Sequence, residues 1–284
     1  MFGEKIDYLL LKPFAHRRGI ATEEALNAKA TDAISDDVIA RGMAELRKYV
    51  TRFEGQFPID SKLSYLDIGC GTGEITIALA RMGCGHATGI DFVPRNIAQS
   101  KAAAARENVT DKVDFVCEDV YKWTPPQKYD VLLSFNAFEH IDTPRLFLES
   151  MLNLISENGM AILAFGPLFH SPFGDHMWGF FRLQIPWRQL LFSEKAILKL
   201  RREYFRPTDP AERYQDIVGG LNKMRYSEFL NYIDETGWKI KYLAVNPFLR
   251  RVGFLYKLSN VFTRSKFLRD YFAATVYVIL ERAA

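Results

Sequence analysis

The sequence predicts an α/β fold, arranged as a doubly wound, mostly parallel sheet of seven strands. Short apolar runs alternate with helix-like patterns through the middle of the chain, which is the rhythm of βα units. One of these runs, residues 129–135, is largely apolar, as expected of a strand buried on both faces. The rhythm stops at residue 166 and resumes near residue 226. We therefore expect N-terminal helices before the sheet and a helical insertion after its fifth strand.

Each predicted element follows from a local pattern. The strands are expected at residues 63–68, 86–91, 112–117, 129–135, 160–165, 239–245 and 274–281. Helices are expected at residues 74–82, 94–107, 144–155 and 227–236, with two more at 188–204 and 210–219 inside the insertion. Pro94 suits a first helical turn, and Asn158 with Gly159 predicts a turn before the fifth strand.

Composition narrows the function classes. The 284 residues are 48% hydrophobic and 25% charged, which excludes wholesale disorder. The net charge of +3 is too small to indicate a nucleic-acid partner. The three cysteines, Cys70, Cys84 and Cys117, lack Cys-x-x-Cys spacing, so we expect a reduced, cytoplasmic protein without a zinc–cysteine site. No apolar run reaches the roughly 18 residues that cross a bilayer, and Glu4 and Asp7 are atypical of a signal peptide.

The strongest motif is the run Asp67-Ile-Gly69-Cys-Gly71-Thr-Gly73-Glu74, which follows a strand and opens a helix. Glycines at such a turn let the backbone approach a ligand closely. A dinucleotide fingerprint would need Gly-x-Gly-x-x-Gly, whose last glycine would fall at Glu74 or Thr76. A carboxylate there would repel a pyrophosphate, so an NAD-dependent oxidoreductase is disfavoured.

This motif resembles the first motif of the class I S-adenosylmethionine-dependent methyltransferases, in their small-molecule branch. Three further stretches extend the resemblance over residues 63–165. They are Gly89-Ile-Asp91-Phe, Cys117-Glu-Asp119-Val, and the run from Tyr129 through Asn136 to Glu139-His140. The resemblance implies a Rossmann-like methyltransferase fold, with S-adenosyl-L-methionine as cofactor and S-adenosyl-L-homocysteine as product.

The resemblance also implies which residues hold the cofactor. Its methionine end would lie over the glycine loop, Asp91 would accept the ribose hydroxyls, and Phe92 would cover the adenine. The full implied set is Asp67, Gly69, Cys70, Gly71, Gly73, Asp91, Phe92, Asp119, Val120 and Asn136. For three of these residues, a purely structural role stays open as the alternative: Asp91 as a helix cap, Asp119 as a solvated loop acid, and Cys70 as a small filler.

On the acceptor side, His140 follows the fourth strand and is the candidate general base; the alternative is that it only caps or packs in its turn. His170, His176 and Trp178 follow the fifth strand and are the candidate substrate-binding residues. Two histidines and Asp175 are a thin ligand set, so no metal site is expected.

These assignments divide the chain into four parts. We expect helices that cover the cofactor site in residues 1–55, the cofactor-binding core in 56–165, a substrate lid in 166–225, and the rest of the core in 226–284. The lid carries arginines expected at the rim of an apolar pocket, namely Arg182, Arg188, Arg201 and Arg202. A small helical subdomain with its own core is the alternative for this segment.

A basic, aromatic insertion at residues 246–270 interrupts the C-terminal part. The interpretation that the sequence favours is a solvated face with ordinary core anchors. A homodimer interface and peripheral contact with a membrane are the alternatives that stay open.

The predicted function is methyl transfer to a small-molecule acceptor, by O-methylation of an apolar or aromatic metabolite. A nucleic-acid methyltransferase is one alternative, and no nucleic-acid partner is expected, because residues 135–138 lack the two prolines of the amino-methylating enzymes that act on DNA and RNA. A non-catalytic methyltransferase-like binding module is the other.

Overall fold

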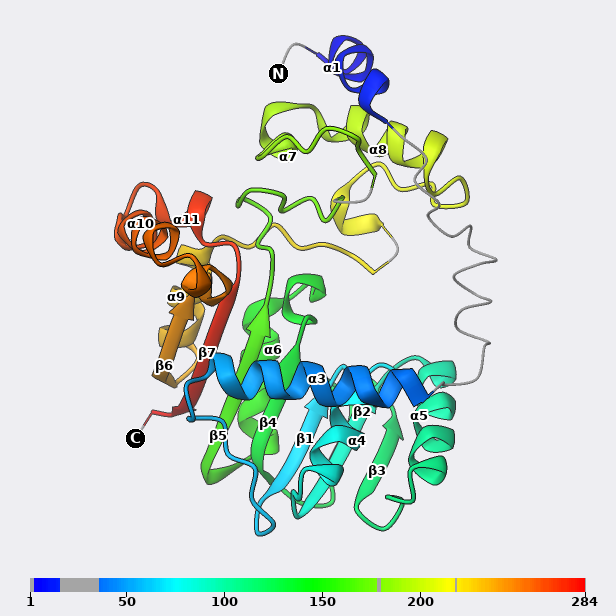
Figure 1. Ribbon diagram of the computed structural model, residues 1–284, viewed down its shortest axis with the longest axis vertical. Helices are drawn as coiled ribbons and strands as arrows, with labels where there is room; N and C mark the ends of the chain where they lie inside the picture. Colours follow the sequence, from blue (N-terminus) through cyan, green and yellow to red (C-terminus); the bar gives the residue numbers. More distant parts are fainter. Residues whose placement is uncertain (1–2, 16–35, 178–179, 218, 284) are drawn as a thin grey trace.

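The computed structural model describes residues 3–15, 36–177, 180–217 and 219–283 (Figure 1). Its centre is a seven-stranded sheet in the order β3-β2-β1-β4-β5-β7-β6, which confirms the predicted fold class. The five parallel strands are β1 Ser64–Ile68, β2 His86–Asp91, β3 Val113–Cys117, β4 Tyr129–Phe135 and β5 Ile155–Phe165. β7, Val276–Arg282, lies antiparallel between β5 and β6, Trp238–Val245.

Helices cover both faces of the sheet, as a doubly wound fold requires. On one face, α3 (Asp36–Arg52), α4 (Glu74–Arg81) and α5 (Pro94–Arg106) contribute Leu46, Ile77 and Ile97 to a common apolar core. On the other face, α6 (Pro144–Leu154) and α9 (Tyr226–Glu235) contribute Phe147 and Phe229. The strand order reverses between β1 and β4, and ligands of such sheets bind at the carboxyl ends of the strands around that point.

Three predicted elements are wrong. β5 begins at Ile155, five residues early, because the turn expected at Asn158 and Gly159 is a bulge: the register slips between the pairs Tyr129–Ile155 and Val131–Met160. The helix expected at 188–204 is two helices, α7 (Arg188–Leu191) and α8 (Glu194–Tyr204), because Phe192 is extended and Ser193 caps α8. Where a helix is expected at 210–219, the described residues of this range form one short 3-10 turn, η3 (Tyr214–Asp216).

Residues 166–225 enclose an apolar core separate from the two cores of the sheet. Phe169, Phe181, Leu200 and Tyr214 are buried in it, together with Leu11 from α1 (Glu4–Leu11). A 3-10 turn, η1 (Lys12–Phe14), follows α1. This segment lies beyond the carboxyl ends of the strands (Figure 1), and we call it the lid.

The sequence predicts that the four lid arginines lie at the rim of a pocket. This prediction is wrong for two of them, Arg188 and Arg201. Arg188 is fully buried, and its Nε donates to Asp175 Oδ2 at 2.8 Å while its guanidinium lies 3.9 Å from the Phe181 ring. Arg201 is also buried, paired with Asp209. These cations hold the lid together, because a buried charge is tolerated only when it is paired.

The last insertion folds into three short elements between β6 and β7. They are η4 (Pro247–Arg251), α10 (Gly253–Arg264) and α11 (Arg269–Phe272). Asn246 holds their two ends together, because its side chain donates to Phe272 O and accepts from the amides of Ala274 and Thr275.

Candidate functional site

The glycine loop after β1 is shaped by three left-handed residues. Gly69, Gly71 and Gly73 have φ of +77°, +53° and +80°, a region that disfavours side chains. A Cβ on Gly73 would lie 2.8 Å from the Phe115 ring, whereas one on Gly71 would meet nothing within 4 Å. Gly73 is thus required by packing, while the backbone at Gly71 is open to a ligand.

A cavity of about 250 Å³ lies over this loop. Five of the predicted cofactor residues line it: Asp67, Gly69, Cys70, Gly71 and Asn136. Six lining residues were not predicted, namely Glu45, Tyr49, Thr72, Glu74, Ile75 and Phe135. Burial raises the pKa of the Cys70 thiol, and its Sγ packs where a side chain on Gly89 would lie. A raised pKa disfavours the thiolate form, and this packing is consistent with Cys70 as a small filler beside the loop.

Helix α3 covers the cavity because Gly42 lets it approach α4 closely. An ideal Cβ on Gly42 would lie 2.6 Å from the carbonyl oxygen of Glu74. This contact places Glu45 and Tyr49, one and two turns further along α3, over the glycine loop. A lone glycine in an otherwise helical segment was the sequence signal for this contact. Of the described N-terminal residues, α3 lies on the cavity, whereas α1 contacts α8 of the lid.

The cavity is lined by three carboxyl groups. Asp67 is buried, accepts a hydrogen bond from Thr76 Oγ1 at 2.7 Å, and has its pKa raised to about 6 by desolvation. Burial also raises the pKa of Glu74, and Glu45 lies on the α3 side. Glu45 is paired with Lys48 Nζ at 2.8 Å, and the charge of Arg41 acts on Glu74 against the effect of burial. The described residues that line the cavity include these three acids and no Lys, Arg or His, so the lining favours a cationic ligand group.

Asn136 links the sheet to α3. It follows β4 with a φ of +52°, and its Nδ2 donates to Tyr49 Oη at 2.9 Å. The Tyr49 ring stacks on Phe135 with 4.0 Å between centroids. These contacts hold α3 against the carboxyl end of β4 at the cavity edge.

Four further predicted cofactor residues, Asp91, Phe92, Asp119 and Val120, lie at or just after the ends of β2 and β3. The Asp91 carboxylate accepts from Gly71 N at 3.0 Å and Val93 N at 2.8 Å, so it joins the glycine loop to the start of α5. Val93, not Asp91, is the N-cap residue of α5. Phe92 is 76% exposed. Asp119 and Val120 are half-buried, and Asp119 Oδ1 accepts from Tyr121 N at 3.0 Å.

His140 ends the 3-10 turn η2 (Phe138–His140) that follows β4. Its Nδ1 lies 2.9 Å from the carbonyl oxygen of Gly220. Because a carbonyl only accepts hydrogen bonds, Nδ1 carries the proton and Nε2 presents a lone pair. Asn222 holds the same turn in place. Its side-chain Nδ2 donates to Phe138 O and Ile141 O, both at 2.8 Å, and its backbone N–H donates to Glu139 O at 2.9 Å. No pattern in the sequence predicts either contact.

Of the two predicted acceptor residues that the structure describes, His170 and His176, it is His176 that lies against His140. The two rings meet edge to face at 5.5 Å. His176 Nε2 donates to Pro167 O at 2.8 Å, and burial lowers its pKa, so it is neutral at pH 7. His170 packs on Phe169, and burial lowers its pKa too. Trp178 lies outside the described residues. Among the residues that the structure describes, no three His, Cys, Asp or Glu side chains form a metal-binding group.

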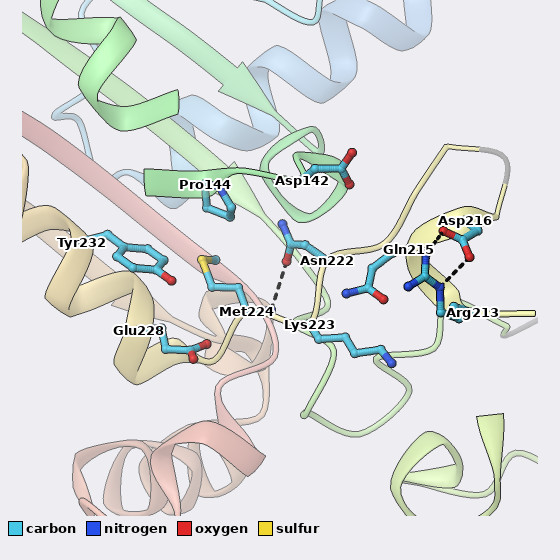
Figure 2. Close-up of a pocket in the computed structure, with 10 residues that line it drawn as sticks. All are labelled: Asp142, Pro144, Arg213, Gln215, Asp216, Asn222, Lys223, Met224, Glu228 and Tyr232. Carbon is cyan, nitrogen blue, oxygen red and sulfur yellow. Dashed lines mark hydrogen bonds and ion pairs between the residues drawn. The ribbon is translucent and has the colours of Figure 1, made fainter. Parts of the chain in front are cut away.

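A second cavity, of about 510 Å³, lies between η2, the end of the lid and α9 (Figure 2). Its cations are already paired: Arg213 makes two hydrogen bonds to Asp216, at 2.7 and 2.8 Å, and Lys223 Nζ lies 2.7 Å from Glu194. Asp142 and Glu228 also line it. This mixture of charges selects neither an anion nor a cation.

Residues 59–165 match the family model described as "Methyltransferase domain". The matched stretch holds strands β1 to β5 and the glycine loop, so this part of the chain is similar to methyltransferase domains.

Similar proteins of known name are ubiquinone biosynthesis O-methyltransferases. The mitochondrial protein of Arabidopsis thaliana is 32% identical over 127 residues, which are 43% of this chain and 39% of that protein. The protein of Rickettsia conorii is 34% identical over 104 residues, covering 37% of this chain and 35% of that one. The chain thus spans about two fifths of the length of these relatives.

Solved structures share the fold at low identity. A magnesium protoporphyrin IX methyltransferase from Synechocystis with bound SAH has a TM-score of 0.51 and 15% identity, over 87% of this chain and 86% of that one. The [4+2]-cyclase SpnF has a TM-score of 0.53 and 13% identity, over 85% and 81%. Proteins of this fold thus carry names of different reactions, and the site must decide the function.

Proposed function

We propose that this protein transfers the methyl group of S-adenosyl-L-methionine to a hydroxyl oxygen of a small apolar or aromatic acceptor. The observation that carries the proposal is the carboxylate-lined cavity over the glycine loop, and His140, whose Nδ1 faces the carbonyl of Gly220, is the proposed base. The O-methyltransferase names of the relatives agree with it.

The cavity fits the cofactor by charge and by shape. S-adenosylmethionine has a sulfonium and an ammonium group, and Asp67, Glu74 and Glu45 line the cavity as counter-charges. The open backbone at Gly71 leaves room for its methionine end. Asp91 would hold the ribose diol, and Phe92, Asp119 and Val120 would hold the adenine. The exposed Phe92 ring is suited to covering a planar base.

The bound cofactor would supply an electrophilic methyl carbon, and the chain would prepare the acceptor. The acceptor oxygen would bond to that carbon as the carbon–sulfur bond breaks, with S-adenosylhomocysteine as the leaving group. His140 Nε2 would take the hydroxyl proton, while Nδ1–H would stay bonded to Gly220 O. Neutral His176 packs against the ring and limits its rotation. Positioning supplies much of the rate in such a displacement.

The acceptor would bind between η2 and the lid. We propose His170, His176 and Trp178 as the residues that contact it. The described part of the lid is rich in aromatic residues, which agrees with an apolar or aromatic acceptor.

Two further features concern the setting of the protein. The three cysteines are free, which agrees with a reduced, cytoplasmic location as a proposal. Among the described residues, no helix has the length and apolar character needed to span a membrane.

The first test is a thermal shift with S-adenosylhomocysteine, beside NADH, on the natural protein and on Asp91→Ala. A ligand at about 100 times its dissociation constant adds about 2.7 kcal/mol to stability, a shift of several degrees. We expect a shift with S-adenosylhomocysteine alone, weakened in the variant. A preference for NADH would overturn the cofactor assignment. Methyl transfer to a panel of phenols and other alcohols then tests the acceptor class.

A further inference from the structure

Helix α10 packs polar side chains against the protein and exposes apolar ones, which is the reverse of a typical surface helix. The side chains that it buries are the polar Ser259 and Thr263, and Ser259 Oγ accepts from Asn246 Nδ2 at 2.6 Å. Large apolar side chains face outward instead: Phe254 is 74% exposed and Val261 is 65% exposed. The spacing of Phe254, Leu258 and Val261 places them on one stripe of the helix.

The apolar surface extends beyond the helix. Phe267, in the turn after α10, is 88% exposed. We define the apolar patch as Val252, Phe254, Leu255, Leu258, Val261 and Phe267. The sequence favours core anchors for these aromatic residues, and that prediction is wrong for Phe254 and Phe267. Contiguous exposed apolar surface of this kind marks an interaction site.

Basic side chains surround the apolar patch. Residues 246–270 contain six Lys or Arg residues and one acid, Asp270. Arg251, Lys257, Arg264 and Lys266 are exposed. The Asp270 carboxylate is turned inward, since it accepts from Ser227 N and Ser227 Oγ, both at 2.8 Å. The outward charge of this surface is therefore positive.

We propose that α10 and the turn after it bind the surface of an anionic lipid bilayer. Apolar side chains would enter the boundary between headgroups and acyl chains, and the lysines and arginines would reach the phosphates. The 12-residue helix is about 18 Å long, so it would lie in the plane of the interface instead of crossing it.

Charge argues against a second copy of this chain as the occupant. A two-fold interface places the same surface on both partners. Four exposed basic residues would then face four others without acids between them, and like charges across an interface are costly. An anionic bilayer satisfies both the apolar and the basic side chains.

The surface is joined to the lid. Trp187, at the start of α7, packs on Phe272 with ring centroids 5.3 Å apart, and its Nε1 donates to Tyr271 O at 3.0 Å. A bilayer bound by α10 would therefore lie beside the segment that faces the acceptor. The binding itself goes beyond methyl transfer and is tested without it.

The test is sedimentation of the full chain with phosphatidylcholine vesicles, with and without equimolar phosphatidylglycerol. We expect binding only to the anionic vesicles, with a loss as salt increases. The double variants Phe254→Ser/Val261→Ser and Lys257→Glu/Lys266→Glu should each weaken binding by about tenfold or more. Since these side chains are exposed, the melting temperatures should stay unchanged.

Matched controls lie elsewhere on the surface. Leu146→Ser on α6 and Lys101→Glu on α5 change exposed residues of the same kinds, and they should leave vesicle binding unchanged. Absence of binding to anionic vesicles, or equal loss in the control variants, would overturn the proposal. So would a concentration-dependent dimer, by analytical ultracentrifugation, that the Phe254→Ser/Val261→Ser variant abolishes.

Discussion

The imidazole of His140 is held by the carbonyl of Gly220, 80 residues further along the chain, at 2.9 Å from Nδ1. His140 belongs to the sheet side of the molecule, whereas Gly220 belongs to the returning end of the lid. A residue of the lid thus determines which nitrogen of the neutral His140 ring carries the proton.

We expect His140→Ala to lower kcat at least about tenfold, since a general base contributes roughly 10² to 10⁴ in rate. Binding of S-adenosylhomocysteine should be unchanged. Steady-state kinetics and a thermal shift measure the two effects. His86→Ala is the matched control, because His86 is paired with Asp114 at the far end of β2. Equal kcat in the natural protein and His140→Ala would remove the base role.

Asn222→Ala should lower kcat by several-fold with little change in cofactor affinity. The substitution removes two side-chain hydrogen bonds to η2, each contributing about 1 kcal/mol to stability. A lower kcat at an unchanged KM for S-adenosylmethionine, measured well below the melting temperature, separates positioning from simple destabilisation. A lower melting temperature with an unchanged kcat would show that Asn222 only stabilises the fold.

Affinity for the cofactor should fall as the pH drops through about 6, where buried Asp67 takes up a proton. Because the folded-state pKa lies above the ordinary 3.8, the folded protein without ligand loses stability as pH rises between these values. Asp67→Asn should therefore raise the melting temperature at pH 7, weaken S-adenosylhomocysteine binding, and remove this pH dependence. Calorimetric titration with S-adenosylhomocysteine measures the affinity at pH 5 and pH 8, roughly one unit below and two units above the pKa of Asp67. If the affinity of Asp67→Asn for S-adenosylhomocysteine kept the pH dependence of the natural protein, Asp67 would not be the group that titrates.

Gly42→Ala should destabilise the protein and weaken cofactor binding, although alanine is normally favoured over glycine in a helix by about 1 kcal/mol. The new Cβ would lie 2.6 Å from Glu74 O, so α3 must move away from the cavity. Gly253→Ala in α10 is the control, because nothing lies within 4 Å of its Cβ position. Chemical denaturation and a thermal shift measure both effects. A stabilised Gly42→Ala protein would mean that α3 tolerates the displacement.

The sheet and the glycine loop could be predicted because their signals are local. Each strand has its own apolar run, and the loop needs left-handed glycines at 69, 71 and 73. The position of α3 over the cavity could not be predicted, because it depends on one contact between Gly42 and Glu74, which are far apart in the sequence. The same holds for the support of His140 by Gly220.

The surface of α10 shows a different limit of sequence reasoning. A stripe formed by Phe254, Leu258 and Val261 has the same spacing whether it faces a core or the solvent. Only the packing of Ser259 and Thr263 against the protein reveals which face is outside. The predicted turn at Asn158 and Gly159 failed for a related reason, because pairing with β4 extended the strand through it.

The separate core of the lid has a consequence for how such enzymes diverge. The family model ends at residue 165, where the lid begins. Because Phe181, Leu200 and Tyr214 pack among themselves and with α1, this segment can change between lineages without disturbing the sheet. The C-terminal end of the lid, however, contacts His140 through the carbonyl oxygen of Gly220. An exchanged lid would bring a new acceptor pocket and a new setting for the base together, so selectivity and reactivity would be inherited as one unit.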